Sequence, residues 1–112
     1  MKFERLNKYQ VMWVFVHFDL PTETKADRKN YSTFRKNLLL DGFAMLQFSI
    51  YIRHCSSREN AEVHKARIKR WLPPKGDVIV FEITDAQFEK IEFFKSAATK
   101  KRPNTPQQLE LF

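Results

Sequence analysis

Hydrophobic residues first gather into a run near the N-terminus of the chain. Residues 11–18 are rich in Val, Phe and Trp and show little alternation with polar residues. Such a run predicts a central strand that is buried on both faces. The strand stops at Asp19, Leu20 and Pro21, because proline lacks the N–H that a β-ladder requires.

A first helix is predicted over residues 23–41, where apolar residues recur three or four positions apart. The stripe consists of Tyr31, Phe34 and Leu38, widened by Leu39 and Leu40. Thr24 with Asp27 suits the helix N-terminus, and Gly42 suits the left-handed residue beyond its C-terminus.

A second helix is predicted after Ser56, which matches the capping-box pattern with Glu59. Its apolar stripe consists of Ala61, His64, Ile68 and Trp71 or Leu72. The segment from Pro73 to Gly76 then ends the helix and turns the chain.

Further strands are predicted on either side of the second helix. Residues 43–53 are strand-like throughout and hold two strands that meet at a turn near residues 47–49. One expected face consists of Phe48, Ile50 and Ile52, and the other of Gln47, Ser49 and Tyr51. Residues 78–83 form another buried strand, residues 84–87 cap a short helical turn, and residues 91–94 form a last short strand.

The order strand, helix, strand, strand, helix, strand is that of a ferredoxin-like α+β sandwich, here with an extra C-terminal strand. Another two-layer α+β sandwich is the simplest competitor. We divide the chain into an N-terminal lead-in (residues 1–10), the ferredoxin-like domain (residues 11–95), and a basic linker with a docking tail (residues 96–112).

The chain carries a formal net charge of +7, from 20 Lys and Arg against 13 Asp and Glu. Such a charge on 112 residues attracts polyanions, although acidic proteins and membrane surfaces are open alternatives. Both predicted helices pack on one sheet face, so we expect their basic residues to share one outer side and to contact phosphates. These are Lys25, Arg28, Lys29, Arg35 and Lys36 on the first helix, and Lys65, Arg67, Lys69, Arg70 and Lys75 on the second helix and its exit. Since the aromatic residues follow the core periodicity, duplex contact is favoured over single-strand stacking.

Two negative features narrow the class of protein. The longest apolar run, residues 11–16, is far shorter than the ~20 residues of a membrane span. Cys55 is the one cysteine, which excludes an intrachain disulfide and fits a reducing cytoplasm.

Asp19 is the most informative carboxylate, because it lies at the carboxyl end of a central strand beside a helix N-terminus. It is either a turn residue that caps the first helix or a ligand for Mg²⁺. A lone aspartate is a poor metal site, so a two-fold axis would have to supply its symmetry mate. His17 shares its strand face and is a possible proton-transfer group, whereas His64 falls on a core stripe. His54 and Cys55 lack zinc spacing with the other histidines.

The ordered motifs resemble the second Cas protein family (CRISPR-associated protein family two), closest to its type II branch. The similar segments are residues 13–21, Tyr31 to Leu40 ("YSTFRKNLLL"), Gly42-Phe43, Met45 to Tyr51, Asp77-Val78 and Thr84 to Phe88. The resemblance covers roughly residues 11–95. The lead-in is longer than is usual in the family, and Met45 stands where several relatives carry a basic residue.

The resemblance implies a homodimer in which the two copies of Asp19 approach the two-fold axis and share one Mg²⁺ ion. It implies that the last strands cross over to extend the partner's sheet. Members serve as the central scaffold between two dimers of the Cas one integrase and span the prespacer duplex. Members have also been described as metal-dependent endonucleases on RNA or DNA. We therefore expect a scaffold for CRISPR adaptation, with a Mg²⁺-dependent endonuclease as the alternative, and an unrelated RNA-binding protein or toxin-like ribonuclease on the same fold as a third hypothesis.

The C-terminal tail is a further candidate site, because large apolar residues end an otherwise polar segment. They are Leu109, Leu111 and Phe112. We expect the tail to add to an edge of the integrase, and residues 108–112 also resemble the pentapeptide that binds the bacterial sliding clamp.

Overall fold

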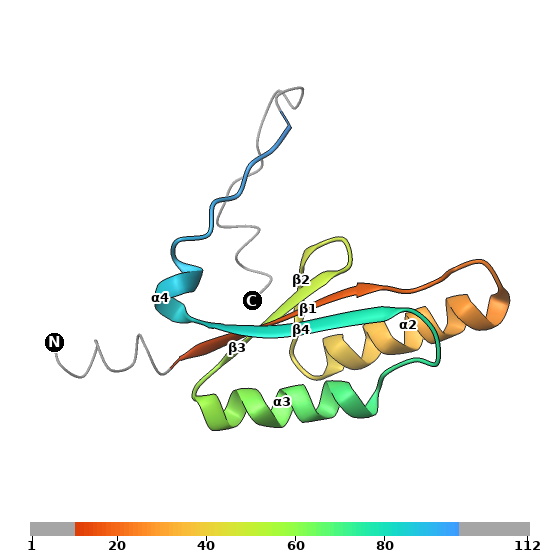
Figure 1. The fold of residues 1–112 in the computed structure, drawn as a ribbon, viewed down its shortest axis with the longest axis horizontal. Helices are drawn as coiled ribbons and strands as arrows, with labels where there is room; N and C mark the ends of the chain where they lie inside the picture. The colour runs from red at the N-terminus through yellow and green to blue at the C-terminus, as the bar shows by residue number, and fades with distance from the viewer. Residues whose placement is uncertain (1–10, 97–112) are drawn as a thin grey trace, which may run out of the picture.

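A four-stranded antiparallel sheet with two long helices on one face forms the body of the chain (Figure 1). The structure is a computed structural model and describes residues 11–96. Its elements are β1 (Met12–Asp19), α2 (Lys25–Leu40), β2 (Ala44–Gln47), β3 (Ile50–Cys55), α3 (Arg58–Arg70), β4 (Asp77–Thr84) and α4 (Asp85–Phe88). The sheet order is β2-β3-β1-β4, so β1 lies inside the sheet. The predicted α+β fold with ferredoxin-like element order is confirmed.

Local signals explain the bounds of the helices. The Thr24 side chain accepts a hydrogen bond from the Asp27 backbone N–H, and the Asp27 carboxylate accepts one from the Thr24 N–H. This is the predicted capping box of α2. The predicted cap of α3 is wrong by one residue. Ser57 has the extended cap conformation and accepts from the Asn60 N–H, so Ser56 lies outside the helix.

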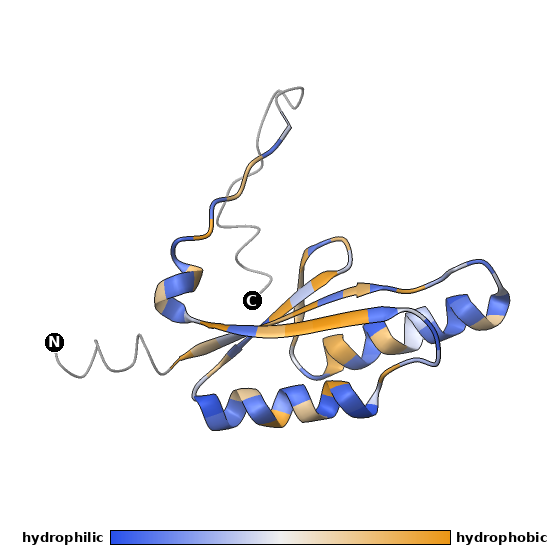
Figure 2. Cartoon of the chain, in the orientation of Figure 1, coloured by the Kyte–Doolittle hydropathy of each residue, from blue (hydrophilic) through white to orange (hydrophobic). Residues whose placement is uncertain are grey.

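Alternate residues of β1 face opposite sides of the sheet. Met12, Val14, Val16 and Phe18 point toward the helices and are almost fully buried against residues of α2 and α3. Figure 2 shows polar and apolar positions interspersed along both helices, whereas the β4 ribbon is largely apolar. The main core therefore lies between β1 and the helix layer.

A buried ionic cluster ties the end of α2 to α3. Asp41 follows α2, and its two carboxylate oxygens bind His64 Nδ1 at 2.6 Å and Arg67 Nη1 at 2.5 Å. Arg53 Nε donates to the Asp41 carbonyl at 2.8 Å. His64 is thus a satisfied core histidine, as its place on the apolar stripe indicates. Because each member has its partner, the cluster fixes the spacing of the two helices.

Three expectations about strands differ from the structure. Residues 78–83 lie on a strand as predicted, but it is not buried on both faces, since Ile79 and Phe81 are exposed. Phe48 does not lie on a strand face; it is 80% exposed in the turn between β2 and β3, where Ser49 has a φ of 68°. Residues 91–94 do not form a strand in the single chain, because no neighbouring strand pairs with them there. This segment leads away from the sheet beyond α4 (Figure 1).

Within residues 11–96, no helix has both the length and the apolar character needed to cross a bilayer.

Candidate functional site

Asp19 lies at the end of β1, on the sheet face opposite the helices. Its side chain is exposed, and it belongs to the alternation of Trp13, Phe15 and His17 on this open face. Thr24 and Asp27 already cap α2, so Asp19 does not serve as the helix cap. The structure thus leaves the carboxylate available for chemistry at the open face.

Asp77 is a second acidic residue at this place, and it was missed in the sequence. It is the first residue of β4 and pairs directly with Asp19 across the β1–β4 ladder. Directly paired residues of antiparallel strands have Cβ atoms ≈ 4.5–5.5 Å apart, so the two carboxylates are neighbours. Asp19 and Asp77 are 58 positions apart in the sequence, and no local sequence pattern indicates that their strands pair. The sequence indicates only the turn, through two prolines followed by Gly76.

Gly76 allows the turn before β4 to pack closely against the end of β1. It has a φ of 97°, and a Cβ there would lie 2.7 Å from the Asp19 carbonyl oxygen and 2.7 Å from Leu20 Cδ2. Only glycine therefore lets the turn approach the end of β1 closely enough to set Asp77 opposite Asp19.

The histidines and the cysteine add no metal cluster. Across residues 11–96, no group of three or more His, Cys, Asp or Glu side chains is placed to hold an ion. Cys55 is fully buried, and burial raises the pKa of its thiol. His17 is exposed on the face of Asp19, as expected, and its neighbours across the sheet are Ile50 and Ile79.

Two of the predicted phosphate-binding residues are already paired. Lys65 Nζ donates to Glu62 at 2.9 Å and to Glu82 at 2.6 Å. The hydrogen bond to Glu82 raises the pKa of Lys65, and the hydrogen bond from Lys65 lowers the pKa of Glu62. Arg67 is bound to Asp41. Acidic residues therefore offset the helix charges at these two positions.

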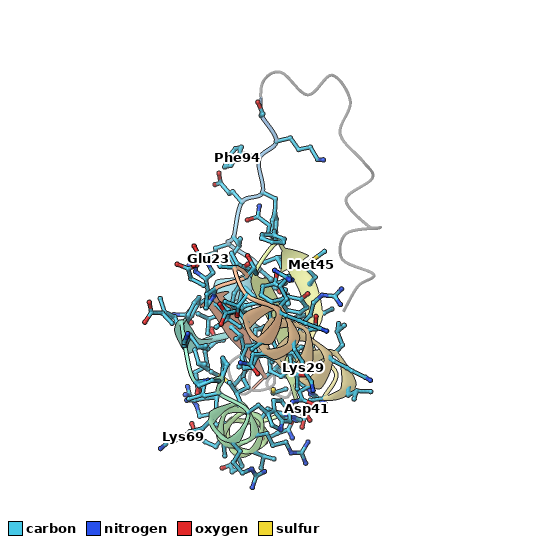
Figure 3. The ribbon with its side chains drawn as sticks, turned by 90° about the vertical axis from the view of Figure 1, so that its right-hand side faces the viewer. Glu23, Lys29, Asp41, Met45, Lys69 and Phe94 are labelled. Atoms are coloured by element: carbon cyan, nitrogen blue, oxygen red, sulfur yellow. The ribbon has the colours of Figure 1, made fainter. Side chains whose placement is uncertain are left out.

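The other predicted basic residues of the helices remain uncompensated. They are exposed, and within residues 11–96 they form no ion pair: Lys25, Arg28, Lys29, Arg35, Lys36, Lys69 and Arg70. Arg28 donates instead to the carbonyls of Thr22 and Glu23 before α2. Figure 3 shows Lys29 beside α2 and Lys69 beside α3. Both helices cover the same sheet face, so these charges and Asp19 lie on opposite sides of the sheet.

The open face is apolar and incompletely covered. Trp13, Phe15 and Ile52 form a second small core, on which α4 and the following residues pack. The Phe88 ring stacks on Trp13, and Trp13 Nε1 donates to Asp85. Large side chains nevertheless stay exposed: Ile79 at 58% and Phe81 at 45% on this face, Phe48 at 80% in the turn between β2 and β3, and Phe94 at 79% beyond α4.

The predicted docking tail lies outside the described residues, as do Leu109, Leu111 and Phe112.

Comparison with known proteins decides the family. The model of the family "CRISPR associated protein Cas2" matches residues 12–91. The chain belongs to the Cas2 family. It is 54% identical to the CRISPR-associated endoribonuclease Cas2 of Flavobacterium psychrophilum over 98% of this chain and 96% of that protein. It is 48% identical to the protein of the same name from Parvibaculum lavamentivorans, over 90% of this chain and all of that one.

A solved structure supports the fold assignment. A crystal structure of Cas2 superposes with a TM-score of 0.53 at 16% identity, covering 84% of this chain and 99% of that one. This match shows the fold, and the family model and the relatives confirm the resemblance of the motifs to the Cas2 family.

The close approach at Gly76 predicts different costs for two glycine substitutions. Gly42 has a similar φ of 92°, but a Cβ there meets only side-chain atoms, those of the Arg53 guanidinium at 3.0 Å, which would have to shift slightly. We expect Gly42→Ala to lower the free energy of unfolding by about 1–2 kcal/mol, the cost of a left-handed residue with a side chain. Gly76→Ala should cost about 3 kcal/mol or more, because backbone atoms must also move. Urea denaturation of both variants measures the difference, and equal losses would contradict the proposed role of Gly76.

Proposed function

We propose that this chain is the central dimeric scaffold of the spacer-integration complex, which binds duplex prespacer DNA and joins two dimers of the Cas one integrase. The observation that carries the proposal is the set of uncompensated Lys and Arg side chains on α2 and α3. Flexible, exposed cations on one side of the molecule suit the regularly spaced phosphates of a duplex, which they contact without reading its sequence.

A homodimer is part of this proposal, because the open sheet face needs a cover. The exposed Phe81 and Ile79 side chains adjoin the small core of Trp13 and Phe15 on the same face. Burying apolar surface stabilises association by about 25 cal/mol per Å² before the costs of binding are subtracted. β4 has one unpaired edge, and residues 91–94 of a second copy could supply the strand that extends it.

Phe81→Asp tests the dimer, with Val63→Asp as a matched control. The two residues are 45% and 46% exposed, but Phe81 lies on the open face and Val63 lies on α3. We expect Phe81→Asp to shift the protein to a monomer, because dimerisation would bury an unpaired charge. Val63→Asp should stay dimeric. Light scattering at several concentrations measures the mass, and a monomeric parent protein or a dimeric Phe81→Asp variant would rule out this interface.

Lys69 and Lys65 offer a matched test of duplex binding. Both lie on α3, but Lys65 is held by Glu62 and Glu82, whereas Lys69 forms no ion pair within residues 11–96. We expect Lys69→Gln to weaken duplex affinity about threefold to tenfold and to reduce the salt slope by about one, because one phosphate contact is lost. Lys65→Gln should change neither by much. Fluorescence anisotropy of a labelled duplex across a salt series provides both values. Equal effects of the two substitutions would count against binding by uncompensated charge.

A Mg²⁺-dependent endonuclease is the second candidate, favoured by the pairing of Asp19 with Asp77 and consistent with the name of the relatives. Their carboxylate oxygens are hard ligands of the kind that Mg²⁺ prefers, so the residues fit the ion. Two such pairs at a dimer axis could share one ion. Bound there, Mg²⁺ would supply charge stabilisation for a phosphodiester. RNA or DNA would be the substrate.

Asp19→Asn separates the two candidates. If the chain acts as a scaffold, the variant should support spacer acquisition in cells within about twofold of the parent, because the duplex contacts lie on the other side of the sheet. Its mass and its co-purification with the integrase serve as controls for assembly. Loss of acquisition with the assembly intact would contradict the scaffold proposal and favour hydrolysis.

A further inference from the structure

A depression of about 360 Å³ lies where the C-terminal ends of α2 and α3 meet. It opens on the helix side of the molecule, away from Asp19. Its lining residues are Asn37, Leu40, Asp41, Arg67, Arg70 and Trp71. The depression therefore combines two guanidinium groups, one carboxamide and two apolar side chains around one opening.

The Asp41 carboxylate in the depression is already bound by two side chains of α3. Asp41 is 7% exposed, and His64 and Arg67 take up one carboxylate oxygen each. This contact fixes the Arg67 guanidinium, which is still 42% exposed and has further N–H donors. Arg70 is exposed and forms no ion pair within the described part of the chain. The depression thus has one positioned guanidinium and one uncompensated positive charge.

Two apolar side chains line the depression, Trp71 on the α3 side and Leu40 on the α2 side. Trp71 is half-buried and packs against the main core, which restrains its indole ring. Leu40 is 76% exposed, although it extends the apolar stripe of α2. Asn37 adds an amide that can both donate and accept. Leu40 is thus exposed beside the two arginines and does not pack in the main core. Apolar and positively charged groups in one depression suit a ligand that has both apolar and anionic parts.

We propose that this depression binds an unpaired nucleotide of the nucleic acid that the helices contact. Arg67 and Arg70 bind its phosphate, and its base lies against Trp71 and Leu40. Guanidinium groups bind phosphate oxygens through charge-assisted hydrogen bonds, and unpaired bases pack on aromatic and apolar side chains, whereas paired bases are shielded within the duplex. This inference rests on the proposed function, since it assumes that nucleic acid lies along α2 and α3.

Two DNA probes test the inference on the full-length protein. One probe is a blunt duplex, and the other is the same duplex with a single-stranded extension of several thymidines. We expect the extension to raise affinity about tenfold, in line with the usual contribution of base stacking. Leu40→Ser should remove most of that gain while leaving blunt-duplex affinity within about threefold. Arg70→Gln also removes one of the charges assigned to the duplex, so it should weaken binding of both probes, but binding of the extended probe about tenfold more than binding of the blunt one. Both side chains are exposed, so both variants are expected to fold.

Matched controls come from the opposite part of α3. Arg58→Gln removes an exposed arginine at the first residue of α3, and Val63→Ser removes an exposed apolar side chain. Neither should change the gain from the extension. Absence of binding to both probes would overturn the proposed function itself. Equal affinity for the two probes would overturn this inference alone, as would a gain that survives Arg70→Gln and Leu40→Ser or that falls equally in the two controls.

Discussion

The structure depends on β1 being apolar on both of its faces. Such a strand is stable only where both sides of the sheet are covered, because each exposed large side chain forgoes about 1.5–3 kcal/mol of burial. The helices meet this need on one side, where Val14, Val16 and Phe18 are buried. On the other side, α4 covers Trp13 and Phe15 only. Phe81 of the neighbouring β4 stays exposed on this side, where the proposed second copy would cover it.

The basic residues on the helix side fall into two groups, those paired with acidic residues and those without an ion pair, and the net charge does not distinguish them. Arg67 is paired with Asp41 at the end of α2, and Lys65 is paired with Glu82 of β4. The charges of these two residues are therefore compensated within the chain. These bonds stabilise the contact of α3 with α2 and β4, so they serve the fold. The remaining helix cations form no ion pair within residues 11–96, although Arg28 donates to the backbone carbonyls of Thr22 and Glu23. A basic composition predicts a polyanionic ligand, and the ion pairs indicate which helix cations remain to contact it in the proposed function.

Features encoded by neighbouring residues could be predicted from the sequence, and features set by distant contacts could not. Pro21, Thr24 and Gly42 act locally, so the ends of β1 and α2 were predicted closely. Ser56 and Ser57 are chemically equivalent as N-caps of α3, so the sequence alone does not decide which of them adopts the extended cap conformation that Ser57 has. Phe48 was misplaced because alternation was extended through the turn at Ser49. Asp77 was missed as a neighbour of Asp19 because strand pairing joins residues that share no local pattern.

The sheet separates the residues of the two proposed functions. Asp19 and Asp77 lie at one corner of the open face, whereas the uncompensated cations lie on the helix layer. A duplex that contacts α2 and α3 therefore has the sheet between it and the carboxylates of the same chain. The proposed phosphate binding on the helix side and the alternative proposal of metal-dependent cleavage at the open face therefore do not require one common substrate. Either could be lost without the other, since no side chain that contacts the duplex in this proposal also positions Asp19.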